Sequence, residues 1–218
     1  MRSTARSYLR QPLNFVFAQP SAVRVLRELA RHGGALPIAL LVDRTKLTRP
    51  SVAGAVRELT ASGLVETLGH AHRLYRFDPE HPLAPALVEL FNSEERRFHN
   101  ILDALRSAAT DVGAAAVWLY GSVARDQDHA DSDLDVVFVL NDDKSGLVGE
   151  DLREILSHAE ASLRFSASVI VLEPAAIRRL IATDDPWWRR MSADASAIQG
   201  TDPLTLAAGV FEGYELPL

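Results

Sequence analysis

The sequence predicts an α+β protein made of two units that are joined by a helix. The 218-residue chain changes from a basic first part to a strongly acidic second part: residues 1–80 hold 12 Lys and Arg against 6 Asp and Glu, whereas residues 81–218 hold 11 against 23. Helical periodicity followed by a hairpin pattern fills the basic part, while the acidic part mixes short apolar strands with helices. The apolar content of 47% is typical of a globular protein.

The composition excludes several classes of protein. The chain has no cysteine, so it can form neither disulfides nor thiolate zinc sites. Its longest apolar runs, such as Ala114 to Tyr120, are too short to span a bilayer. The basic N-terminus is followed only by the short apolar run from Phe15 to Ala18, which is no secretory signal. We therefore expect a cytoplasmic protein without a membrane partner.

The basic part begins with an amphipathic helix, for which Ser21 is the expected N-cap. Apolar residues recur at 22, 25, 26 and 29, and two glycines at 33 and 34 end the helix. A second short helix is predicted over 37–45. Thr48 is the expected N-cap of a third helix, which runs through SVAGAVRELTASG. LVETLG and HRLYRFD then alternate with a period of two and predict a hairpin.

Three helices followed by a two-stranded wing are the layout of a winged helix-turn-helix. The stretch LTRPSVAGAVRELTASGLVE resembles the recognition-helix segment of MarR- and ArsR-type bacterial regulators. That resemblance implies that the last helix enters the major groove of double-stranded DNA. The candidate DNA-binding residues are Thr48, Arg49, Ser51, Arg57, Arg73 and Arg76. The excess of positive charge favours DNA over the alternative, a protein-docking or dimerisation module.

Three domains are predicted along the chain. A winged helix DNA-binding domain occupies residues 1–80 and includes a basic N-terminal arm, which carries Arg2, Arg6 and Arg10. The apolar stripe of LAPALVELFNSEERRFHNILDALRSAA predicts a connecting helix over 81–110, and an α+β domain fills 111–218. Because winged-helix regulators usually bind paired half-sites, the resemblance also implies a homodimer.

The stretch GSVARDQDHADSDLDVVFV in the acidic part carries the candidate site. A buried strand over 114–120 leads into Gly121 and Ser122, and the next residues open a helix. Such a turn forms an anion site from free backbone amides and the helix dipole. Arg125 is a third candidate for nucleotide phosphates, and the alternative is that it pairs with a neighbouring aspartate.

Asp133 and Asp135 enter the following strand two residues apart, which places both carboxylates on one face. Two like charges side by side are costly unless a cation lies between them. Carboxylate oxygens suit Mg²⁺, or Mn²⁺ in its place, with water and substrate phosphates as further ligands. We therefore expect Asp133 and Asp135 to hold a metal ion.

The element from GSVAR to DSDLD resembles the signature of the DNA polymerase β-like nucleotidyltransferase superfamily, and most of all its minimal bacterial and archaeal members. The resemblance covers about residues 100–218. It implies a small mixed sheet with helices mainly on one side, and it implies that WWRRMSADASAIQGTDP is the C-terminal helix of the domain. It also implies that Gly121 and Ser122 take an NTP, while Asp133 and Asp135 are the catalytic, metal-binding carboxylates. The full chain resembles bacterial regulators that fuse a winged helix to such a domain.

One position departs from this signature. Active members carry a third carboxylate on the neighbouring strand, and Ser168 in SASVIVLEP stands at the matching position. A serine hydroxyl cannot act as a general base at neutral pH. The acids that would have to replace it are Glu173 on the same strand and Asp128, Asp131 or Glu160 from elsewhere. The tandem Trp187 and Trp188 are interpreted as a packing anchor, with stacking of one ring on a base as the alternative.

Three functional hypotheses follow. The first is a DNA-binding transcriptional regulator whose nucleotidyltransferase-like domain binds Mg-NTP with little or no catalysis. The second is an active nucleotidyltransferase, targeted by the winged helix, that transfers NMP from an NTP to a hydroxyl acceptor. The third is an antitoxin-like partner-binding protein, which rests on analogy alone.

Overall fold

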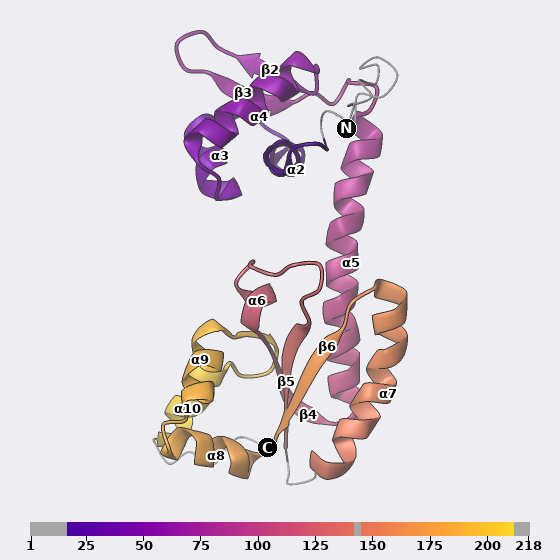
Figure 1. Ribbon diagram of the computed structural model, residues 1–218, viewed down its shortest axis with the longest axis vertical. Helices are drawn as coiled ribbons and strands as arrows, with labels where there is room; N and C mark the ends of the chain where they lie inside the picture. Colours follow the sequence, from indigo (N-terminus) through magenta and orange to yellow (C-terminus); the bar gives the residue numbers. More distant parts are fainter. Residues whose placement is uncertain (1–16, 142–144, 212–218) are drawn as a thin grey trace, which may run out of the picture. The chain divides into compact units, whose positions relative to one another are not determined.

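The computed structural model describes residues 17–141 and 145–211, so the predicted basic arm lies outside the described residues. The chain forms two compact units, one up to Glu95 and one from Arg96 on, and helix α5 contains the boundary (Figure 1). The helices are α2 (Pro20–His32), α3 (Ile38–Thr45), α4 (Arg49–Ala61), α5 (Ala84–Asp111), α6 (Gly121–Ala124), α7 (Ser145–Leu163), α8 (Pro174–Ala182), α9 (Pro186–Asp194) and α10 (Pro203–Phe211). The strands are β1 (Leu36–Pro37), β2 (Val65–Leu68), β3 (Leu74–Phe77), β4 (Ala114–Tyr120), β5 (Leu134–Leu140), β6 (Ala167–Leu172) and β7 (Ser196–Gln199). None of the described helices is both long and apolar enough to cross a membrane.

The first unit contains the three predicted helices and the predicted hairpin. Gly33 ends α2 with a φ of 69°, and the Thr48 side chain caps α4 by accepting a hydrogen bond from the Ser51 amide. Ser21 was wrong as an N-cap, because α2 begins one residue earlier at Pro20, whose fixed φ suits the first helical position. The two-residue strand β1 was not predicted; it pairs with β3 and widens the hairpin to three strands.

A four-stranded sheet forms the centre of the second unit, in the order β6-β5-β4-β7. Strands β5 and β6 are parallel, whereas β4 is antiparallel to both β5 and β7, which confirms the predicted small mixed sheet. The stretch WWRRMSADASAIQGTDP is wrong as one helix. Its first part forms α9, and the chain then turns extended at Ala195 and pairs β7 with β4.

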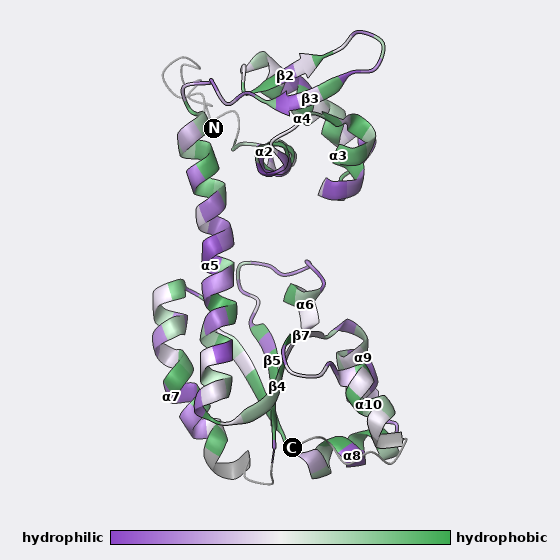
Figure 2. Cartoon of the chain, turned by 180° about the vertical axis from the view of Figure 1, so that it is seen from behind, coloured by the Kyte–Doolittle hydropathy of each residue, from purple (hydrophilic) through white to green (hydrophobic). Residues whose placement is uncertain are grey.

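Both faces of this sheet are covered, so the expectation of helices mainly on one side is wrong. One face packs against α5 and α7 through residues such as Val136 and Phe138, and the other packs against α8 and α9 through Trp118 and Val137 (Figure 1). Because β4 and β5 carry apolar residues at nearly every position, each face needs its own cover. The loop from α6 to β5 is hydrophilic by contrast (Figure 2).

Candidate functional site

The turn after β4 is built around Gly121. Its φ is 77°, a left-handed conformation that side chains with a Cβ rarely adopt. A Cβ placed on Gly121 would lie 2.2 Å from Oδ2 of Asp135, because the Asp135 carboxylate rests directly on the Gly121 backbone. The predicted turn and the predicted metal ligand are therefore in van der Waals contact, and only glycine permits that contact.

The helix that follows is a single turn, and this corrects part of the predicted anion site. Helix α6 ends at Ala124, since Asp126 adopts a positive φ of 55°. Four residues align too few peptide dipoles to make a substantial macrodipole, so phosphate binding here must rely on individual donors. Ser122 is one such donor: it is half-buried, and within residues 17–141 and 145–211 its hydroxyl has no hydrogen-bond partner.

Asp135 lies between two neighbouring strands, with Tyr120 opposite it on β4 and Ser168 opposite it on β6. Burial raises the pKa of the Asp135 carboxyl, and the charge of Asp133 raises it further. A hydrogen bond from the Ser168 hydroxyl and the charge of Arg125 act in the opposite direction. A bound cation would stabilise the charged form of a partly desolvated carboxylate that has a second carboxylate nearby.

The register of β6 shows what stands at the third-acid position. Ser168 is directly beside Asp135, whereas Glu173 follows the far end of the strand, where it precedes α8. In the described part of the chain, no three His, Cys, Asp or Glu side chains are grouped closely enough to hold a metal ion. A Mg²⁺ held by Asp133 and Asp135 would therefore have to take its other ligands from water and phosphates, as this ion usually does.

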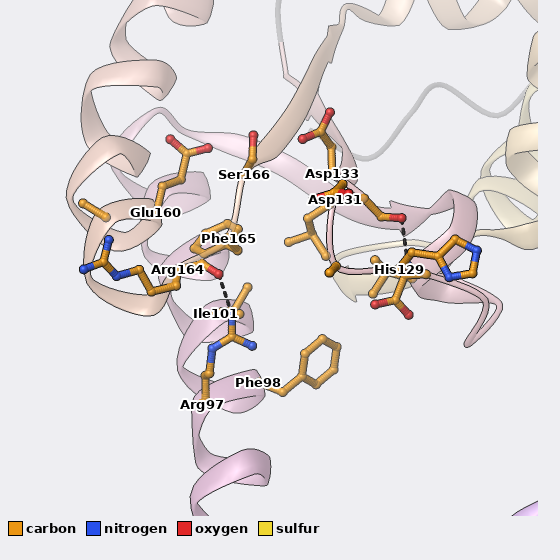
Figure 3. A pocket seen from close by; sticks show the side chains of 16 residues that line it. Arg97, Phe98, Ile101, His129, Asp131, Asp133, Glu160, Arg164, Phe165 and Ser166 are labelled. Atoms are coloured by element: carbon orange, nitrogen blue, oxygen red, sulfur yellow. Dashed lines mark hydrogen bonds between the residues drawn. The ribbon is translucent and has the colours of Figure 1, made fainter. Parts of the chain in front are cut away.

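A pocket of about 600 Å³ lies on one side of this centre and is bordered by Asp133 (Figure 3). Its walls include Phe98 from α5 and the loop acids Asp128 and Asp131. Glu160 also lines the pocket, but its Oε1 accepts a hydrogen bond of 2.7 Å from the amide of Ala167. Three of the acids expected as possible substitutes for the missing carboxylate are thus found here. Glu160 is bound to the first residue of β6, and Asp128 and Asp131 line the pocket beside Asp133.

On the other side of the Gly121 turn lies a groove of about 630 Å³, which Arg125 helps to form. Arg125 pairs with Asp194 at the end of α9 and donates a 3.3 Å hydrogen bond to Gln127. The partner expected from the sequence was a neighbouring aspartate, Asp126 or Asp128. Asp194 was missed because it is 69 residues away along the chain, and no local pattern connects the two.

The predicted DNA-binding residues lie on α4 and on the hairpin. Thr48 and Ser51 are exposed at the start of α4, and their hydroxyl oxygens are 2.9 Å apart. Arg49, Arg57 and Arg73 are exposed, and in the described residues none of the three forms an ion pair.

Other basic residues of the first unit already have acidic partners. Arg76 differs from the three unpaired arginines because it donates to Glu66, its register partner on β2, at 2.6 Å. Arg27 and Arg44 likewise pair with Glu94 and Glu28. Among the described residues, Arg24 on the exposed side of α2 is a further arginine without an ion pair, and it is not one of the predicted DNA-binding residues. An excess of such unpaired cations is a better guide to a polyanion surface than the total charge.

Comparisons with known proteins divide the chain in the same way. Residues 19–73 match the family model of the MarR family, and residues 99–185 match the model of a nucleotidyltransferase domain. No curated protein matches the chain.

Among solved structures, a mutant of the toxin–antitoxin MntA-HpeT is 14% identical, over 51% of this chain and 87% of that one, with a TM-score of 0.37. NadR in complex with 4-hydroxyphenylacetate is 22% identical, over 48% and 85%, with a TM-score of 0.34. BpsR of Bordetella bronchiseptica is 23% identical, over 40% and 69%, with a TM-score of 0.28. The family models thus confirm the predicted fusion: the chain joins a MarR-family winged helix domain to a nucleotidyltransferase domain.

Proposed function

We propose that this protein is a DNA-binding transcriptional regulator whose second unit binds a magnesium–NTP complex and performs little or no nucleotidyl transfer. The observation that carries the proposal is the Asp135 carboxylate, which rests on Gly121 and is close enough to Asp133 for that charge to shift its pKa. In this arrangement Asp133 and Asp135 bind Mg²⁺ or Mn²⁺, and Gly121 and Ser122 contact the phosphates. A bound metal would neutralise the phosphate charge and bridge it to the two aspartates.

Arg125 completes the phosphate site in this proposal. Its guanidinium is close enough to Asp135 to influence the carboxyl pKa, and it lines the groove beside Gly121. The pair with Asp194 holds the guanidinium at this position before a ligand arrives. A triphosphate would offer Arg125 a second, more highly charged acceptor.

DNA binding rests on the three predicted arginines that have no acidic partner among the described residues. Arg49 at the start of α4, Arg57 two turns later and Arg73 before β3 leave their charges available to phosphates or base edges. We expect the protein to act as a cytoplasmic homodimer, as the MarR resemblance implies.

Ser168 is the reason to expect weak catalysis. Its hydroxyl donates to Asp135 and cannot take a proton from an attacking hydroxyl at neutral pH. Of the carboxylates that could replace it, Glu173 lies beyond the far end of β6. The second unit then keeps the groups that bind a metal nucleotide and lacks the group that would activate an acceptor.

A labelling experiment tests this proposal against an active nucleotidyltransferase. We expect purified protein, incubated with α-labelled ATP or GTP, Mg²⁺ or Mn²⁺ and a panel of hydroxyl-bearing acceptors, to transfer no label above background. Ser168→Asp places a carboxylate beside Asp135, and we expect it to raise any transfer that the panel permits. Label transfer by the wild type that disappears in Asp135→Asn would contradict the proposal.

The structure also offers one observation that favours the active enzyme. The 600 Å³ pocket that borders Asp133 is large enough for an acceptor, and His129 and Asp131 stand in its wall (Figure 3). An acceptor hydroxyl in this pocket would approach the metal ligands from the side opposite the groove. The labelling experiment therefore needs the Asp135→Asn control in every acceptor series.

A further inference from the structure

The two adjacent tryptophans of α9 have different environments. Trp188 is only 5% exposed and meets Trp118 edge to face in the core, with ring centroids 5.9 Å apart. Trp187 is half-buried and lines the groove beside Gly121. Trp188 is therefore the buried part of the predicted packing anchor, whereas Trp187 packs against the edge of the same core and also lines the groove.

Trp187 is held in place by its surroundings. The Asp185 side chain caps α9 and accepts hydrogen bonds from the amides of Trp187 at 2.8 Å and Trp188 at 3.3 Å. The Trp187 ring also packs edge to face on the Tyr120 ring, at 86° and with centroids 6.2 Å apart. An edge-to-face pair leaves at least one face of each ring uncovered by the other. The groove thus contains an immobilised aromatic surface.

The rest of the groove has the composition of a nucleotide site. Three arginines line it: Arg125, which pairs with Asp194, Arg189, which pairs with Asp184, and Arg190, which forms no ion pair among the described residues. Its volume of about 630 Å³ is within the range of sites that enclose a small ligand. Gly121 and Trp187 both line the groove, so a ligand with its phosphates at the turn could reach Trp187 within the same groove.

We propose that Trp187 stacks on the base of the bound nucleotide, with its ribose and phosphates extending toward Arg125 and Gly121. This inference rests on the proposed function and adds to it the side of the site that holds the nucleoside. Stacking on an aromatic face accepts any base. We therefore expect ATP and GTP to bind with similar affinity.

The experiment compares Mg-ATP with Mg-bound inorganic triphosphate, which lacks the nucleoside, in calorimetric titrations of the full chain. We expect ATP to bind the wild type more tightly, and Trp187→Ala to weaken ATP binding roughly tenfold while leaving triphosphate binding unchanged. Trp187→Phe keeps an aromatic face and should restore most of the ATP affinity. In the wild type, ATP but not triphosphate should quench tryptophan fluorescence, and Trp187→Phe should remove most of that quenching.

The outcomes separate the two proposals. If triphosphate binds but ATP binds no tighter, and Trp187→Ala changes neither affinity, the stacking role is overturned while the phosphate site stands. If neither ATP nor triphosphate binds the wild type, the proposed function itself fails, and the inference fails with it. Should Trp187→Ala not fold, the Trp187→Phe affinities and the quenching of the wild type still decide between these results.

Discussion

Gly121→Ala is expected to abolish Mg-ATP binding and to destabilise the second unit by about 2–5 kcal/mol. The first cause is the φ of 77°, which costs a residue with a Cβ about 1–2 kcal/mol. The second is steric, because the new Cβ would lie 2.2 Å from Oδ2 of Asp135 and would displace that carboxylate. Urea unfolding followed by tryptophan fluorescence measures the loss, since all three tryptophans, Trp118, Trp187 and Trp188, belong to the second unit.

Two comparisons make this prediction specific. Gly149→Ala in α7 of the same unit meets no atom within 4 Å, and we expect it to stabilise the unit by about 0.5–1 kcal/mol. An Asp135→Ala background removes the contacts at 2.2 and 3.0 Å and leaves only the Cβ of residue 135 at 3.2 Å, so the cost of Gly121→Ala should fall close to the conformational part. Equal costs in both backgrounds would show that Asp135 does not rest on Gly121.

Replacing Arg49, Arg57 and Arg73 together by alanine is expected to weaken binding to a mixed-sequence DNA duplex by at least about a hundredfold. These arginines have no acidic partner among the described residues, so their charges are available to DNA phosphates. Each lost phosphate contact should also reduce the slope of log affinity against log salt by about one. Gel shifts over a salt series measure both quantities.

The matched control uses arginines of the same unit that already have partners. Arg44 pairs with Glu28, and Arg76 pairs with Glu66. Arg44→Ala with Arg76→Ala removes two positive charges, yet we expect a much smaller loss of DNA affinity. If the control pair weakens DNA binding as much as the triple variant, net charge rather than the α4 and hairpin surface determines binding. If neither variant changes the DNA affinity measured by gel shift, the result favours the alternative that the winged helix is a protein-docking module.

The elements of both units were predictable because their signals are local. Apolar spacing, Gly33 and Thr48 define the helices of the first unit, and each acts over a few residues. The elements that were missed depend on distant partners. The short strand β1 exists only because β3 lies beside it, and β7 pairs with β4 some eighty residues earlier in the chain.

In the candidate site, too, the features with a local sequence signal were predicted and those that depend on distant residues were not. The turn at Gly121 and the close pair Asp133 and Asp135 follow from sequence spacing, and the structure brings them together. The position of Ser168 opposite Asp135 was also inferred, from a resemblance, and the register of β5 and β6 agrees with it.

Three features of the site and of the DNA surface had no local signal. These are the Arg125–Asp194 pair, the Arg76–Glu66 pair and the different environments of Trp187 and Trp188. Each depends on which strands and helices become neighbours in the folded chain. Sequence spacing does not contain that information.

The most direct test of the central claim is a calorimetric titration of the protein with ATP in the presence of Mg²⁺ and again in EDTA. We predict saturable binding that requires the metal and that falls by more than about a hundredfold in Asp133→Asn with Asp135→Asn, because even the partners of metal ligands contribute about 10- to 100-fold. Asp128→Asn, which removes a nearby exposed carboxylate, is the matched control and should leave the affinity unchanged. Binding that survives EDTA or the loss of both aspartates, or no binding by the wild type at all, would contradict the account.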